Sequence, residues 1–213
     1  RFQVPAMALA EANKAIAHMG EVALKNLKRS CVLLVRWEPH RVDVINDNED
    51  HLDEFTDKMD NYLVNLSRYV ETDYDNQYIN MLMQGSSNFE RIGDHAKNIA
   101  DSAVLRKERG IKFSDESFNE LREMMELINE NVHLCIEVFA HQKEEHLPRI
   151  EELEDKVDVM ERQVQQAHID RLKRNECTPD AGMLFSDIVS GLERVSDHAV
   201  NIAYSMVKEN ASN

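Results

Sequence analysis

The chain has 213 residues, with 25 Lys and Arg against 40 Asp and Glu, so its formal net charge at pH 7 is −15. This excess of carboxylates excludes nucleic-acid partners, because their backbone phosphates would repel the protein, and it favours cations or basic surfaces as partners. With 6 Gly and 4 Pro, the chain also has few of the turn residues that strands and hairpins need.

Six long segments carry apolar residues three and four positions apart, a spacing that predicts α-helices. Pro39 ends the first segment, because proline lacks an amide proton and restricts the residue before it. The polar residues 71–75 close the second segment, and Gly110 suits a left-handed cap at the end of the third. The predicted helices cover about residues 5–37, 42–70, 76–109 and 114–142, then begin near 148, with apolar positions through 167, and at 179.

Two helix starts in the second half have clear signals. Ser114 is a good N-cap, and Asp115 and Glu116 follow it in the first turn, where the helix dipole favours negative charge. Thr178 and Pro179 place a capping side chain directly before a proline at the first helical position. These signals predict that the fourth and sixth helices begin at these residues.

The third and sixth predicted helices share a phrase. Residues 90–100 read ERIGDHAKNIA and residues 193–203 read ERVSDHAVNIA, at an offset of 103 positions. A repeat at half the chain length indicates two related units. We therefore expect an all-α protein made of two antiparallel three-helix bundles, residues 1–110 and 111–213, which lie side by side and share a core.

Carboxylates recur at four-residue spacing beside the apolar positions of four helices, so each pair lies on one helix face. Clustered like charges near a core are costly unless protons, arginines or a cation compensate them. Oxygen donors in this arrangement suit magnesium, calcium, manganese, iron or zinc. The candidate metal ligands are Glu49, Asp53, Glu90, Asp94, Glu154, Asp158, Glu193 and Asp197.

Two interpretations without metal stay open. The carboxylates could belong to solvated acidic helix faces, or they could pair with Arg91 and Arg194 in a salt-bridge network. His95 and His198 each follow a candidate aspartate by one residue, which rotates them by about 100° around the helix. We expect them to orient a carboxylate or to lie at a surface or interface rather than to bind metal directly.

At these residues the chain resembles the PhoU family, with its signature Glu-Arg-x-x-Asp-His-x-x-Asn-Ile present in both halves. The resemblance implies a PhoU-like fold of paired three-helix bundles. It also implies that the eight candidate carboxylates hold metal clusters, and that the protein regulates phosphate transport without being an enzyme. Ser196 stands where the first copy has Gly93, and Tyr204 where it has Asp101, so the second cluster is expected to differ from the first.

Residues 4–12 resemble the segment that follows the membrane portion of bacterial sodium/phosphate cotransporters, and the chain begins with Arg1. Both features favour the cytoplasmic tail of a cotransporter over a free-standing PhoU regulator. The implied partners are the transporter's membrane domain and phosphate, at the inner face of the plasma membrane. A second copy of the chain stays open as a further partner.

The chain itself has no apolar run near the roughly 20 residues of a membrane helix. Its basic residues between positions 25 and 41 are typical of an ordinary helix end, with contact to anionic lipid as the alternative. Three cysteines without a CxxC pattern favour a reducing compartment.

Three classes of function remain. A metal-loaded regulatory module is the leading hypothesis, and a metal-free acidic docking module is the second. A di-iron oxidase is the third, but such a site needs two Glu-x-x-His motifs from different helices, and this chain has one, at Glu130 and His133.

Overall fold

The structure, a computed structural model, describes residues 6–211, and all regular structure within that range is helical. This confirms the predicted all-α class with six long helices. The start predicted at residue 5 lies outside the described residues. The α-helices are α1 (Ala6–Val35), α2 (Pro39–Ser67), α3 (Asp73–Arg109), α4 (Asp115–His141), α5 (Leu147–Lys173) and α6 (Pro179–Ala211), with a short 3₁₀ helix, η1 (Glu144–His146), before α5.

The caps predicted from sequence are confirmed. Gly110 ends α3 with φ of 62°, a left-handed conformation that costs glycine little. The Ser114 hydroxyl accepts a hydrogen bond of 3.1 Å from the amide of Ser117. Thr178 does the same for the amide of Ala181 at 3.2 Å. Each bond satisfies an amide that has no partner inside its helix.

Two predicted boundaries were wrong. Pro39 does not merely end the first helix; it stands in the first turn of α2, where its missing amide proton costs nothing. The polar residues 71–75 contain the start of α3, because the Thr72 hydroxyl caps it by accepting a hydrogen bond from the Asp75 amide at 3.1 Å.

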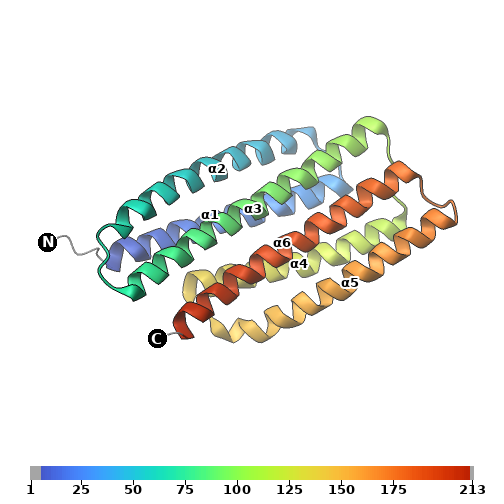
Figure 1. Cartoon of the computed structure of the whole chain (residues 1–213). Coiled ribbons are helices and arrows are strands. Elements are labelled where there is room, and N and C mark those ends of the chain that lie inside the picture. Colours follow the sequence, from blue (N-terminus) through green and yellow to red (C-terminus); the bar gives the residue numbers. More distant parts are fainter. Residues whose placement is uncertain (1–5, 212–213) are drawn as a thin grey trace.

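The helices run alongside one another, with α3 and α6 adjacent in the middle and α2 and α5 on opposite flanks (Figure 1). Helices α1 and α4 contact each other and pack against α3 and α6 respectively. One continuous hydrophobic core includes residues from all six α-helices. Within it, the rings of Phe89 and Phe139 meet edge to face at 5.5 Å, across the boundary between the two halves.

Among the described residues, no helix combines the length and apolarity that crossing a membrane requires. The core is instead distributed along one stripe of each helix, as amphipathic packing predicts.

Candidate metal centres

The first candidate centre lies between α2 and α3. Glu49 and Asp53 come from successive turns of α2, and Asp94 comes from α3. One carboxylate oxygen from each of the three residues lies within 4.8 Å of the other two. We call this group cluster 1. Glu49 is 3% exposed, and its Oε2 atom is buried with no hydrogen-bond partner in the described part of the chain.

The second candidate centre lies between α5 and α6. Asp158 comes from α5, and Glu193 and Asp197 come from successive turns of α6. Their nearest carboxylate oxygens are again within 4.8 Å of one another. We call this group cluster 2. Each half of the molecule therefore brings three carboxylates together where its second and third helices meet.

Two of the eight carboxylates singled out from the sequence lie outside these groups. Glu90 is near cluster 1, and burial raises its pKa while a hydrogen bond with Thr56 lowers it. Glu154 is near cluster 2, and burial followed by the charge of Asp158 raises its pKa. Neither residue belongs to the two groups of three carboxylates defined here, and their role as metal ligands stays a prediction.

The two clusters are not copies of each other, and Gly93 explains the difference. A Cβ atom built on Gly93 would lie 3.0 Å from Glu49 Oε2, so the missing side chain makes room for the buried glutamate. The equivalent residue in the second half is Ser196, which is also buried. Its hydroxyl accepts a hydrogen bond of 3.3 Å from Asn131 Nδ2. There the half-exposed Glu154 stays outside the cluster, and Glu193 takes the third position.

Burial and nearby carboxylates raise the pKa values of two carboxyl groups in each cluster. For Glu49, burial is the largest cause and the adjacent Asp94 is the next, and together with nearby carboxylates they raise its pKa to about 9. For Glu193, burial followed by the adjacent Asp197 raises the pKa to about 7. The pKa values of two further members are raised chiefly by burial as well: Asp53 and Asp158.

This donor set fits a hard cation. Three carboxylate oxygens within bridging distance repel one another, and the orphaned oxygen of Glu49 has lost its hydration without gaining a donor. A divalent ion would compensate the charge and coordinate that oxygen. Arginine does not do so here, because neither Arg91 nor Arg194 forms a salt bridge among the described residues. The salt-bridge interpretation of these carboxylates was therefore wrong.

The two histidines of the repeated phrase lie between the halves. His95 and His198 stack with ring centroids 5.3 Å apart and an interplanar angle of 23°. Nδ1 of His198 is 3.3 Å from the side-chain oxygen of Asn88. Burial lowers the pKa of each ring, and the other nearby positive groups lower it further. The rings thus occupy the α3–α6 interface rather than a ligand position.

The Glu130 side chain of the lone Glu-x-x-His motif is engaged elsewhere. Both of its carboxylate oxygens accept hydrogen bonds of 3.0 Å from Arg149, in a bidentate ion pair at the surface. A glutamate fixed in this way has no free oxygen directed toward a second metal-binding helix.

Comparison with known proteins identifies a family whose domain matches both halves of the chain. The PhoU domain model matches residues 16–103 and 121–206. The curated Phosphate-specific transport system accessory protein PhoU homolog 1 of Thermotoga maritima is 28% identical over 131 residues, which cover 62% of this chain and 56% of that protein. The match therefore spans only about half the length of the relative.

Two solved structures share the fold. The crystal structure of the phosphate transport system regulatory protein PhoU from Streptococcus pneumoniae aligns with a TM-score of 0.86 at 18% identity, over 97% of each chain. The crystal structure of PhoU from Pseudomonas aeruginosa aligns with a TM-score of 0.88 at 19% identity, over 97% of this chain and 99% of that one.

Proposed function

The chain belongs to the PhoU domain family, and from this premise we propose that it regulates phosphate transport as a metal-loaded binding module. The observation that carries the proposal is the pair of three-carboxylate clusters, one in each half. In this proposal the protein docks on a phosphate transporter at the cytoplasmic face of the membrane. It has no catalytic role, and the repeats 1–110 and 111–213 each supply one centre.

A free-standing regulator is better supported than the cotransporter tail expected from the N-terminal segment. The relatives are named as accessory and regulatory proteins of phosphate transport systems. The segment that suggested a tail begins in residues 1–5, which lie outside the described residues. We therefore propose the free-standing form and keep the tail as the second version.

The residues that would hold metal are Glu49, Asp53 and Asp94 in cluster 1, with the members of cluster 2 in the other half. Bound cations would neutralise the carboxylates and offer coordination positions to phosphate oxygens. The protein's own contribution is the packing of the two helices, which fixes how each is turned about its axis and so brings three carboxylates together. In this proposal Glu90 and Glu154, which lie beside the clusters, would act as neighbours that tune the bound metal.

Metal analysis tests this proposal. Protein purified without chelator should contain more than one equivalent of a divalent or transition metal, and the double variant Asp94→Asn/Asp197→Asn should lose it. The matched control Asp50→Asn/Asp155→Asn removes two carboxylates from the same helix pairs, outside the clusters, and should keep its metal. A folded native protein without metal would instead favour the acidic docking module.

Phosphate binding is tested separately. Isothermal calorimetry with inorganic phosphate on metal-loaded protein should give heat beyond dilution, and the metal-free Asp94→Asn/Asp197→Asn variant should give none. If loaded protein gives no heat, phosphate does not bind at the clusters, and the regulator would respond to the transporter alone.

A further inference from the structure

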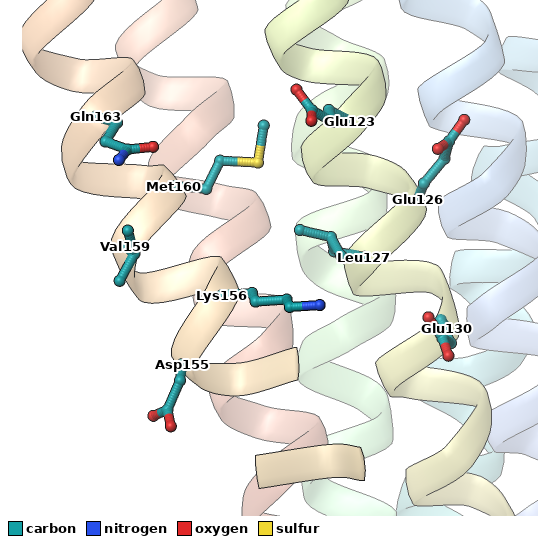
Figure 2. Close-up of a pocket in the computed structure, with 9 residues that line it drawn as sticks. All are labelled: Glu123, Glu126, Leu127, Glu130, Asp155, Lys156, Val159, Met160 and Gln163. Atoms are coloured by element: carbon teal, nitrogen blue, oxygen red, sulfur yellow. The ribbon is translucent and has the colours of Figure 1, made fainter. Parts of the chain in front are cut away.

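A groove between α4 and α5 lies away from both clusters and has a volume of about 670 Å³. Its floor is apolar: Leu127 and Met160 point into the space between the two helices (Figure 2), and Val159 on α5 is 44% exposed. Acidic residues Glu123, Glu126 and Asp155 lie along its sides. The groove thus combines an uncovered apolar strip with negative charge.

The acidic residues on the sides of the groove have no ion-pair partner within residues 6–211. Glu123, Glu126 and Asp155 form no salt bridge among the described residues. The other charged residues of the groove are paired: Glu130 binds Arg149 at 3.0 Å, and Lys156 binds Glu152 at 3.1 Å. Three carboxylates without an ion pair therefore line the groove, and they offer complementary charge to a basic partner.

The repeat provides an internal comparison. Residues 105 positions earlier form the corresponding surface between α1 and α2, and there Glu54 stands in place of Val159. The Glu54 carboxylate pairs with Lys58 Nζ at 2.8 Å. His18 stands in place of Glu123. The first-half surface thus has neither the exposed valine nor a carboxylate at the position of Glu123, and its additional carboxylate, Glu54, is paired with Lys58. The repeat itself therefore does not require the groove features of the second half.

We propose that the α4–α5 groove binds a cationic amphipathic helix of another protein. One apolar row of that helix would cover Leu127, Val159 and Met160, and flanking Lys and Arg residues would pair with the three free carboxylates. Two adjacent helices present a ridge-lined groove of the width that a third helix fills. A second copy of this chain is the weaker occupant, because two molecules of charge −15 repel each other.

This proposal adds to the proposed function the chemistry of the segment by which the partner docks. It rests on the proposed function only in taking the partner to be part of a phosphate transporter. The probe is a synthetic, fluorescein-labelled amphipathic helix of Leu and Lys, about 18 residues long, which spans about five helical turns. Fluorescence anisotropy measures its dissociation constant from metal-loaded protein at physiological salt.

Two matched triple variants separate the groove from general acidity. Glu123→Gln/Glu126→Gln/Asp155→Asn removes the free carboxylates of the groove, and we expect it to weaken binding by about tenfold or more. Glu21→Gln/Asp50→Asn/Glu54→Gln removes the same charge from the first-half surface, and we expect a change below about twofold. Equal weakening in both variants would overturn the proposal, since binding would then follow net charge alone.

The apolar floor is tested with valines of similar exposure. Val159→Ser should weaken the peptide several-fold, whereas Val64→Ser, at a site 45% exposed on α2, should not. Analytical ultracentrifugation of the protein without peptide tests the remaining outcome. If the protein self-associates and the groove variants abolish this self-association, the groove binds a second copy of the chain and the proposal is overturned. Metal content, measured on every sample, shows whether a failure concerns the groove or the clusters.

Discussion

Gly93 and Glu49 lie against each other across the α2–α3 contact. A Cβ atom at position 93 would approach Glu49 Oε2 to 3.0 Å and Leu52 Cδ1 to 2.7 Å. The absence of a side chain on α3 therefore permits the burial of a carboxylate on α2. Because the corresponding residue of the second half is Ser196, the relationship exists in one half only.

The variant Gly93→Ser tests this contact. The added side chain should displace Glu49 and Leu52, weaken metal binding at cluster 1, and lower the free energy of unfolding by about 1–3 kcal/mol. Calorimetric metal titration and urea unfolding measure the two effects. The reciprocal change, Ser196→Gly, leaves Asn131 without its acceptor and also destabilises the fold, but metal binding at cluster 2 should persist. Unchanged metal binding in Gly93→Ser would contradict the assigned role.

The metal-free protein should become less stable as pH rises. Because the pKa of Glu49 is raised to about 9 in the fold, the folded state keeps a proton that the unfolded chain releases near the ordinary value of 4.5. This contribution to stability is fully present below the ordinary value and is lost as pH rises toward about 9. Glu193, with a pKa of about 7, adds to the decline at lower pH.

Thermal unfolding in the presence of chelator, from about pH 5 to about pH 9, measures this slope. Glu49→Gln should flatten it over most of the range, whereas Asp50→Asn, next to Glu49 but outside cluster 1, should leave it intact. If the stability of Glu49→Gln falls with pH as steeply as that of the unaltered protein, the proton responsible lies on another residue.

Metal binding at neutral pH should release protons. With a pKa raised to about 9, the Glu49 carboxyl keeps its proton at pH 7, so filling cluster 1 should release about one proton, and Glu193, with a pKa of about 7, should release a further fraction at cluster 2. Titrations in two buffers of different ionisation enthalpy give this number. The Glu49→Gln variant should release about one proton fewer. An unchanged number of released protons would show that metal binding does not displace a proton from Glu49.

Arg171 holds a buried ion pair whose loss should be costly. It is 3% exposed and binds Glu120 Oε1 at 2.5 Å, while its Nη2 atom and Glu120 Oε2 have no hydrogen-bond partner among the described residues. Arg171→Met leaves the largely buried Glu120 carboxylate without an ion-pair partner and should lower the free energy of unfolding by about 3–5 kcal/mol. Urea denaturation measures the change.

Two further variants show whether charge explains the loss at Arg171. Adding Glu120→Gln to Arg171→Met should restore part of the stability, because no buried unpaired charge remains; Glu116, 3.7 Å from Arg171, is 66% exposed and stays hydrated. Lys58→Met breaks the exposed pair with Glu54 and should cost under about 1 kcal/mol. A loss of similar size in all three variants would show that packing, not charge, dominates.

The fold could be predicted closely from the sequence where a signal is local. Gly110, Ser114 and Thr178 act through bonds to residues within the same turn, so their identity and position are sufficient. The start of α3 was missed because the polar residues 71–75 are compatible with either a loop or a first turn. The Thr72 cap, which decides between them, depends on backbone geometry.

The candidate site could be predicted only in part. Four-residue spacing places Glu49 and Asp53 on one face without reference to other helices. Which third carboxylate joins them depends on the rotation of α3 and on space beside Gly93, both set by tertiary packing. The same limit applies to Glu90 and Glu154, which have the right spacing and lie beside the clusters rather than in them.

The shared core also bears on the origin of this architecture. In one repeat alone, α1 and α3 would expose to water the apolar faces that α4 and α6 cover here. A single-repeat ancestor would therefore have needed to assemble as a homodimer, with its symmetry axis passing close to the stacked rings that are now His95 and His198.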